Sequence, residues 1–202
     1  IPGELLIINN EKICKKIKFN DFLTTQSNDN TSLDDLYYET TILIEESIKK
    51  MMVADVEIGC FLSGGVDSSL VASIMQKNSN KKIKTFSIGF KEKQYDESQF
   101  AKKISQHLKT DHHELILSSN DLLENVEKVS RIYDEPFGDS SFLPTYLLSK
   151  FASKSVKVVL SGDGGDETFL GYNRYSFAKR FEKFNDITPL HFRTLIAKLL
   201  NL

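Results

Sequence analysis

The stretch that decides the fold reads Ile58-Gly59-Cys60-Phe61-Leu62-Ser63-Gly64-Gly65-Val66-Asp67-Ser68-Ser69. Its first five residues form an apolar run typical of a short buried strand, and a helical pattern continues beyond the serines to about Gln76. Between the two, consecutive glycines let backbone N–H groups turn towards one point, because no Cβ atom obstructs them. The stretch predicts a strand, a tight glycine-rich turn and a helix.

The turn has the composition of a phosphate-binding loop. The start of the following helix offers free N–H groups and a partial positive charge, and three serines add hydroxyl donors. Asp67 can hold a magnesium ion on phosphate oxygens. The alternative is a strand–helix turn with Ser and Asp as N-caps, but such a turn does not need this many polar residues. No Lys follows the glycines, so the loop suits a leaving pyrophosphate better than γ-phosphoryl transfer.

Strands and helices alternate along most of the chain. Short apolar strands separated by longer helices are typical of parallel βαβ units, so we predict an α/β fold with a parallel twisted sheet flanked by helices. Such sheets bind ligands at the carboxyl ends of their strands, near a switch point. The expected strands are Glu57–Leu62, Lys84–Gly89, His113–Leu117 and Val156–Leu160, and the later helices are Glu97–Leu108, Ser119–Ile132, Phe142–Ser153 and about Tyr175–Phe184.

The beginning of the chain has a different pattern. Leu5–Ile8 and Ile13–Phe19 predict two strands of a hairpin that is joined through Asn9-Asn10-Glu11. The polar stretch Thr24–Asn30 has the composition of a linker. We therefore separate residues 1–30 from an α/β domain at residues 31–202. That domain opens with a helix that reaches about Met52, is capped by Thr31 or Ser32, and carries Asp34 and Asp35 in its positive first turn.

A second glycine-rich loop, Ser161-Gly162-Asp163-Gly164-Gly165-Asp166-Glu167, follows the strand Val156–Leu160. Its three carboxylates repel one another unless a cation or a polar ligand lies among them. The alternative is an acidic surface turn, in which Asp and Gly are both common. Because both loops end strands of one predicted parallel sheet, we expect them to face a single cleft.

Composition and charge exclude several classes of protein. The chain is 40% hydrophobic and 27% charged, as in ordinary globular proteins, and its formal net charge of -2 gives no general attraction to nucleic acid. The lysine-rich stretch Lys77–Lys84 is interrupted by polar residues, which favours a solvated turn over a phosphate-binding patch. No apolar run has the length of a membrane-spanning helix.

The two cysteines argue for a reducing, cytoplasmic setting. Cys14 and Cys60 lie far apart and have no spacing typical of a disulfide framework or a zinc site. Cys60 falls inside an apolar run, where we expect a small buried residue.

The first loop resembles the SGGxDS signature of the ATP pyrophosphatases, which attack the α-phosphate of ATP and release pyrophosphate. Together with Ser161–Glu167 it resembles the synthetase domain of the asparagine synthetases, over about Ser32 to Tyr175. The agreeing stretches are Phe86-Ser87-Ile88-Gly89-Phe90, Tyr95-Asp96-Glu97, Thr110-Asp111-His112-His113-Glu114 and Asp134-Glu135-Pro136-Phe137. The resemblance implies the adenine-nucleotide alpha-hydrolase-like fold and a ligase that uses ATP and Mg²⁺.

The resemblance also implies a nucleotide site across the two loops. The adenine is expected near Leu62 and Ile88, and the ribose and α-phosphate near Ser161 and Gly162. The residues expected to hold the β- and γ-phosphates are Ser63, Gly64, Gly65, Asp67, Ser68 and Ser69. We expect Asp67 and Asp166 to be the magnesium ligands, since this hard cation prefers carboxylate oxygens.

By resemblance, the β-carboxylate of aspartate attacks the α-phosphorus, and ammonia then displaces AMP from β-aspartyl-AMP. Asp163 and Glu167 are the candidates for orienting the substrate or accepting protons from ammonia. Several relatives have Glu where this chain has Asp163, which is one methylene shorter. His112 and His113 lie next to a predicted strand, and we favour a structural role for both. Asp96 and Glu97 fit either the rim of the cleft or the N-terminus of a helix.

The expected partners follow from the same resemblance. Ammonia is to come from glutamine through an N-terminal glutaminase domain of the same polypeptide, which the Pro2-Gly3-Glu4 hairpin would join to the synthetase domain. Ile1 is not an initiator Met and helical periodicity continues from Leu190 to Leu202, so we expect a piece of a longer protein that alone binds ATP weakly and turns over poorly. A homodimer is left open as its assembly.

Three alternatives for function also stay open at this point. The chain could amidate another carboxylate, for example in surface polysaccharide synthesis, or belong to a β-lactam-forming relative. It could also be a non-catalytic nucleotide-binding module, although intact carboxylates at Asp67, Asp163, Asp166 and Glu167 argue against that role.

Overall fold

The computed structural model describes residues 3–19, 31–133, 138–189 and 192. The predicted linker Thr24–Asn30, the segment Asp134–Phe137 and almost all of Leu190–Leu202 lie outside these residues. The chain divides into two compact units, Ile1–Ile44 and Glu45–Leu202, which are described separately. No helix among the described residues is both long and apolar enough to cross a membrane.

The first unit contains the predicted hairpin. Strands β1 (Glu4–Asn9) and β2 (Lys12–Lys18) pair in antiparallel fashion, with a register shift between Ile7 and Ile8. The connecting residues Asn10 and Glu11 have φ angles of 47° and 61°. Two successive left-handed residues match the twist of a tight hairpin, which is why a turn forms at this point.

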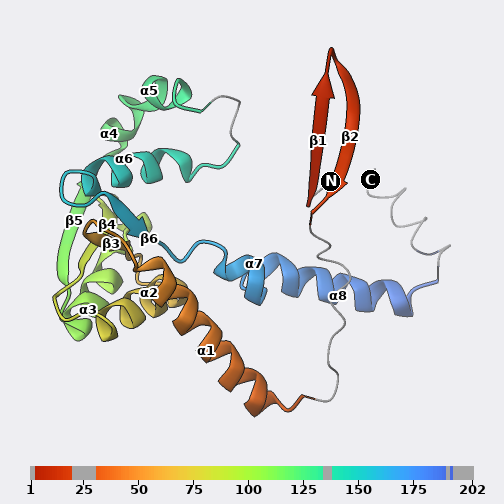
Figure 1. Cartoon of the computed structure of the whole chain (residues 1–202), viewed down its shortest axis with the longest axis horizontal. Helices are drawn as coiled ribbons and strands as arrows, with labels where there is room; N and C mark the ends of the chain where they lie inside the picture. The colour runs from red at the N-terminus through yellow and green to blue at the C-terminus, as the bar shows by residue number, and fades with distance from the viewer. Residues whose placement is uncertain (1–2, 20–30, 134–137, 190–191, 193–202) are drawn as a thin grey trace. The chain divides into compact units, whose positions relative to one another are not determined.

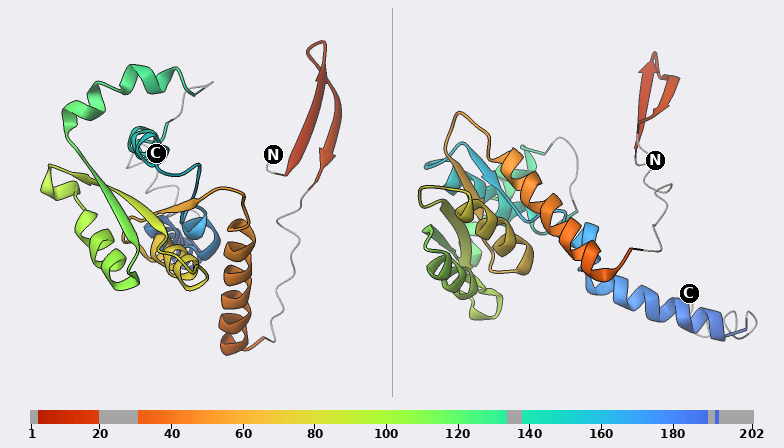
Figure 2. Two further views of the ribbon diagram at one scale, coloured as in Figure 1. Left: turned by 60° about the vertical axis from the view of Figure 1, so that its left-hand side comes forward. Right: turned by 60° about the horizontal axis from the view of Figure 1, so that its bottom comes forward.

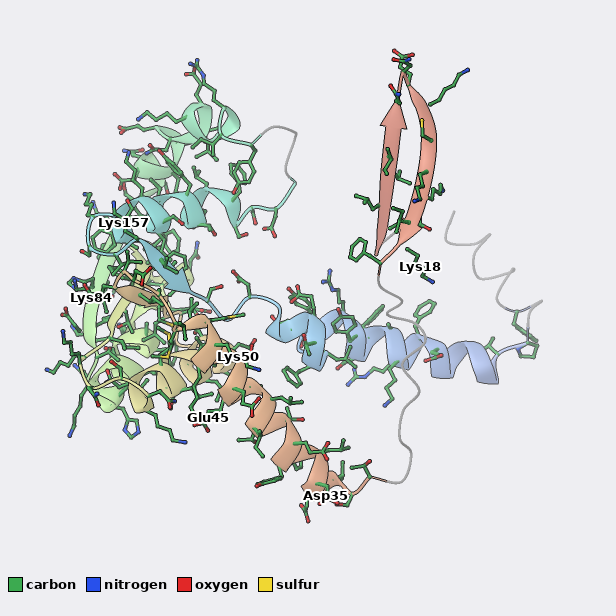
Figure 3. All side chains as sticks on the ribbon, in the orientation of Figure 1. Lys18, Asp35, Glu45, Lys50, Lys84 and Lys157 are labelled. Carbon is green, nitrogen blue, oxygen red and sulfur yellow. The ribbon has the colours of Figure 1, made fainter. Side chains whose placement is uncertain are left out.

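Helix α1 (Leu33–Met51) is the element that Thr31 or Ser32 was expected to cap. Ser32 is the cap: its Oγ accepts a hydrogen bond from the backbone N of Asp35 at 3.2 Å and donates one to Asp35 Oδ2 at 2.6 Å. Further along α1 lies Glu45, which is labelled in Figure 3. It pairs with Lys49 at 2.9 Å and with Lys77 at 3.2 Å. Lys84, at the other end of the lysine-rich stretch, pairs with Glu57 at 2.9 Å. Both ends of that stretch therefore make solvated ion pairs.

The second unit is built on a parallel sheet, as predicted. Its strands are β3 (Ile58–Phe61), β4 (Lys84–Phe90), β5 (Asp111–Leu117) and β6 (Val158–Leu160), in the spatial order β5-β4-β3-β6. Helices α2 (Val66–Lys77) and α3 (Ser98–Leu108) cover one face, and α6 (Phe142–Ala152) covers the other (Figures 1 and 2). From β3 the chain first adds strands on one side and later adds β6 on the other. The switch point of the sheet is therefore between β3 and β6.

The sheet core lies on both faces of the central strands. Phe86 on β4 is 1% exposed and packs with Ala152 and Val156, while Cys60, Leu62, Ala72, Met75 and Ala101 are buried around α2 and α3. Burial raises the pKa of the Cys60 thiol to about 12. Cys60 is thus the small buried residue that its apolar context predicts, and its thiol stays protonated.

The single helix predicted over Ser119–Ile132 is wrong, because the structure has two short helices, α4 (Ser119–Leu123) and α5 (Val126–Ser130). Asn125 explains the break. Its side chain donates a hydrogen bond to the Asp121 backbone O at 2.8 Å, and so competes with the helical backbone. The sequence also gave no sign of η1 (Lys93–Tyr95) and α7 (Gly165–Phe169), and the final helix is longer than predicted, at α8 (Asn173–Ile187).

Two histidines on β5 have structural contacts. His112 Nδ1 hydrogen bonds with Thr85 Oγ1 at 2.9 Å, and its Nε2 with Ser87 Oγ at 3.3 Å. The ring of His113 stacks on Phe86 with a centroid distance of 5.3 Å. These contacts support the structural role that we favour for both residues.

The half-buried ring of His112 makes folding sensitive to pH. Burial lowers its pKa in the folded chain below the ordinary value, so the unfolded chain takes up the proton first as the pH falls. We expect the free energy of unfolding to decrease between pH 7.5 and pH 5, and His112→Asn to reduce that decrease. Urea denaturation at both pH values measures it, with His107→Asn at an exposed position as control. Equal pH dependence in wild type and His112→Asn would contradict this assignment.

Candidate functional site

The two glycine-rich loops touch each other at the carboxyl ends of β3 and β6. A Cβ atom on Gly162 would lie 2.6 Å from the backbone N of Ser68 and 2.9 Å from the Cβ of Asp67. A Cβ atom on Gly165 would lie 2.5 Å from the Asp67 Cγ. Any larger residue at either glycine would push the loops apart. Gly162 and Gly165 are therefore required by the contact of the second loop with the first.

A cleft of about 820 Å³ opens where the loops meet. The predicted site residues that line it are Leu62, Ser63, Gly65, Asp67, Ser68, Ile88, Ser161, Gly162, Asp163 and Asp166. This confirms that the two loops face one cleft. Three predicted residues do not line it, namely Gly64, Ser69 and Glu167, and each has a different position.

The first loop is ordered by its own serines. Ser63 Oγ and Ser68 Oγ share a hydrogen bond of 2.9 Å, and the backbone N of Ser63 donates to Ser68 Oγ at 3.2 Å. The backbone N of Gly65 donates to Ser63 Oγ at 3.2 Å. Because Gly65 is the N-cap of α2 and has no side chain, it cannot cap the first N–H groups of this helix. These groups are the natural donors for an anion in the cleft.

Gly64 and Ser69 support the loop from outside the cleft. Gly64 has a φ of +86°, and a Cβ atom there would lie 2.6 Å from the backbone N of Ala101 on α3. The glycine lets the turn pack directly on that helix. The hydroxyl of Ser69 is buried and has no hydrogen-bond partner within the described part of the chain.

The second loop presents its carboxylates to two hollows. Ser161 Oγ donates a hydrogen bond to Asp163 Oδ2 at 2.9 Å, and Gly164 takes a φ of +89° before α7 begins. Asp163 and Asp166 line the large cleft and also an adjoining pocket of about 370 Å³. The other residues of this pocket are Tyr133, Asp139, Ser141, Phe142, Thr145, Gly162, Gly164, Glu167 and Tyr172.

Glu167 belongs to this smaller pocket. Its Oε1 accepts a hydrogen bond of 2.6 Å from the hydroxyl of Tyr172. That bond is the main reason why the pKa of Glu167 is below its ordinary value, and it raises the pKa of Tyr172 to about 12. A hydrogen bond from the Ser141 backbone N to Asp139 Oδ1, 2.8 Å long, likewise lowers the pKa of Asp139. The pocket thus holds ionised carboxylates at neutral pH.

The carboxylates fit a magnesium ion that is carried mainly by phosphate. Within the described ranges no three His, Cys, Asp or Glu side chains gather as a complete metal site. Mg²⁺ needs only one or two protein carboxylates when phosphate oxygens and water fill its other positions. Asp67 lies against Gly165, next to Asp166, and both carboxylates line the cleft. This donor set suits the ion.

The sequence did not predict that α6 contributes to the lining of the cleft. Pro144, Thr145 and Leu148 of α6 line it, and their segment has the sequence of an ordinary helix, so no motif marks them. Glu97 also lines the cleft and is at the same time the N-cap residue of α3, where its side chain makes no capping hydrogen bond, so it lies both at the rim and at the helix N-terminus. Asp96 instead fixes the loop: its Oδ1 accepts hydrogen bonds from the backbone N of Ser98 at 3.1 Å and of Phe90 at 3.3 Å.

Fold and site together define a parallel α/β protein with a glycine-rich cleft at the switch point of its sheet. A family model described as Asparagine synthase matches residues 39–201. The chain therefore belongs to the asparagine synthase family.

Curated relatives agree with this family. The chain is 46% identical over 149 residues to putative asparagine synthetase (glutamine-hydrolyzing) 2 of Methanocaldococcus jannaschii, which covers 70% of the chain and 29% of that protein. It is 37% identical over 145 residues to asparagine synthetase (glutamine-hydrolyzing) 1 of Bacillus subtilis, covering 72% and 23%. The chain thus spans about a quarter of the length of these relatives.

Among solved structures, the chain is similar to NMN synthetase from Francisella tularensis, with a TM-score of 0.44 and 17% identity over 71% of this chain and 59% of that one. The NH3-dependent NAD synthetase from Campylobacter jejuni matches with the same TM-score and identity, over 71% and 62%. At this level of similarity the two structures add nothing to the fold, which rests on the strand order itself.

Proposed function

We propose that this chain is the ATP-using part of a longer asparagine synthetase and that its cleft forms an acyl-adenylate from ATP and aspartate. The contact between the Ser63–Ser69 and Ser161–Glu167 loops carries the proposal, because it joins a phosphate cradle to a carboxylate-rich loop in one cleft. Membership of the asparagine synthase family supports it. The adenine-nucleotide alpha-hydrolase-like fold is part of the same proposal.

ATP would lie along the carboxyl ends of the strands. Leu62 and Ile88 are apolar residues that line the cleft, and the base would lie against them. The β- and γ-phosphates would accept hydrogen bonds from the open N–H groups of α2 and from the serines of the first loop. Ser161 and Gly162 would contact the ribose and the α-phosphate, since they lie where the second loop meets Ser68.

Magnesium would be held between Asp67 and Asp166, and when bound it neutralises charge on the leaving pyrophosphate. The backbone N–H groups at the start of α2 would stabilise the same charge, because the fold holds this end of the helix at the cleft before a substrate binds. The chain thus favours a leaving pyrophosphate without the lysine of a Walker A loop.

The chemistry would proceed in two balanced steps. An oxygen of the aspartate β-carboxylate bonds to the α-phosphorus while the bond to pyrophosphate breaks. The ammonia nitrogen then bonds to the acyl carbon while the bond from this carbon to the AMP oxygen breaks, so AMP leaves with the oxygen that aspartate supplied. The surplus proton on the nitrogen passes to a carboxylate or to water. Asp163 and Glu167 are the candidates to orient the substrate and accept that proton, because both line the pocket that adjoins the cleft.

The remaining parts of the proposal concern the longer protein. Ammonia would come from glutamine, hydrolysed by an N-terminal glutaminase domain that the β1–β2 hairpin adjoins. The first two curated relatives are both named glutamine-hydrolyzing, which supports this arrangement. Residues 1–30 would then connect the domains and residues 31–202 would belong to the synthetase domain, in a cytoplasmic enzyme.

Pyrophosphate release tests the substrate. The full-length synthetase is incubated with ATP, Mg²⁺ and ammonium chloride, together with aspartate, glutamate, or a larger carboxylic acid. We expect release with aspartate and little with the others, because a shape-fitted acceptor site discriminates against an added methylene by about tenfold or more. Release with another acid but not with aspartate would show that a different carboxylate is amidated.

A further inference from the structure

The smaller pocket contains a side-chain arrangement that the proposed reaction does not yet use. The Tyr172 hydroxyl donates to Glu167 Oε1 at 2.6 Å. The Arg174 guanidinium carbon lies 4.2 Å from the centroid of the Tyr172 ring, and the Tyr175 ring is 5.9 Å away from it. The Tyr172 ring is therefore held by two neighbours at the start of α8, and its hydroxyl is presented to Glu167.

Glu167 depends on this hydrogen bond because its own helix does little to fix the position of its side chain. Helix α7 has five residues, and it ends at Leu170 in the left-handed conformation with a φ of 56°. Glu167 is exposed, so packing does not hold its three side-chain torsions. A preformed hydrogen bond restricts this long flexible side chain before the substrate arrives, so less rotamer entropy is lost when the substrate binds.

The hydrogen bond also decides which carboxylate oxygen is left for a ligand. Tyr172 occupies Oε1, and no other side chain in the described part of the protein donates a hydrogen bond to this carboxylate. Glu167 lines the pocket together with Asp139, Asp163 and Asp166, which share its sign of charge, while Arg174 supplies the opposite charge from behind Tyr172. The pocket therefore presents an oriented acceptor beside the two carboxylates that also face the cleft.

We propose that Tyr172 is a positioning residue that holds Glu167 so that its second oxygen accepts a hydrogen bond from the incoming ammonia. This inference rests on the proposed function. It assigns the smaller pocket to the amination step and the large cleft to adenylation. Arg174 acts through Tyr172, because its planar guanidinium stacks on the ring and prevents it from turning away.

Separate measurement of the two half-reactions tests this assignment in the full-length synthetase. Tyr172→Phe keeps the ring and its stacking and removes only the hydroxyl. We expect it to raise the KM for ammonia by about tenfold, the value of one hydrogen bond to a charged group. The rate of aspartate-dependent exchange between pyrophosphate and ATP, and the KM for ATP, should stay within about twofold. Tyr175→Phe removes a hydroxyl from the neighbouring ring and should change neither half-reaction.

A double substitution shows whether Tyr172 acts through Glu167. We expect Tyr172→Phe to raise the KM for ammonia no further when Glu167→Gln is already present. An unchanged KM in Tyr172→Phe, an equal loss of exchange activity, or an additive effect in the double variant would overturn the inference. If the wild-type enzyme shows no aspartate-dependent exchange at all, the proposed function itself fails, which is a distinguishable result.

Discussion

Gly162→Ala should reduce aspartate-dependent exchange between pyrophosphate and ATP by at least about a hundredfold, equivalent to about 2.7 kcal/mol of transition-state stabilisation. The added methyl group would lie 2.6 Å from the Ser68 backbone N and 2.9 Å from the Asp67 Cβ. These atoms belong to backbone and to the base of a side chain, so they cannot rotate away. The second loop must move back, and a displacement of about 1 Å in a reaction geometry costs about a hundredfold in rate.

Gly138→Ala is the matched control, because a Cβ atom at Gly138 meets no atom of the described residues within 4 Å. It should keep wild-type exchange activity. Thermal unfolding of both variants separates local displacement from loss of the fold: overpacking costs about 1–3 kcal/mol, which a folded domain survives. Near-wild-type exchange in Gly162→Ala would mean that contact between the two loops is not needed for the chemistry.

Asp67→Asn should reduce the same exchange rate by about 10²–10³-fold, as the loss of one electrostatic contact to a developing charge does in other enzymes. Asn has the shape of Asp, so the side chain can still pack against Gly165 and the loops can stay together. What is lost is the negative charge that a magnesium ion requires. The required concentration of Mg²⁺ should therefore rise together with the fall in rate.

Asp55→Asn provides the control for charge alone, since Asp55 is exposed in the loop before β3. It should leave both the exchange rate and the magnesium requirement unchanged. The account of the metal site would be wrong if Asp67→Asn lowered the rate without changing the dependence on Mg²⁺. A loss of thermal stability equal to the loss of rate would instead assign Asp67 to holding the loops together.

The parallel sheet could be predicted because strands such as β3 and β6 are short apolar runs that end at a clear polar or glycine signal. Leu62 to Ser63 and Leu160 to Ser161 are the sharpest of these boundaries, and both loops follow them. Since parallel strands bring their carboxyl ends to one edge, two loops about 100 residues apart were expected in one cleft, and they share one. Local pattern and topology together were sufficient for this part of the site.

The remainder of the site depends on packing that has no local signal. Thr145 and Leu148 line the cleft because of how α6 lies on the sheet, and a helical pattern does not say which face meets a ligand. Tyr172 reaches Glu167 only because Leu170 turns the chain through a left-handed conformation, which sequence rules assign to glycine. The break at Asn125 was missed for a similar reason, since apolar periodicity continues across it while the side chain bonds to the backbone.

Transfer of oxygen from aspartate to AMP tests the central claim most directly. The full-length synthetase is given aspartate labelled with ¹⁸O in its β-carboxylate, together with ATP, Mg²⁺ and ammonia, and the products are analysed by mass spectrometry. If the cleft forms an acyl-adenylate, one labelled oxygen leaves with the α-phosphorus and appears in AMP. AMP that carries no label, or label that appears in inorganic phosphate instead, would contradict it.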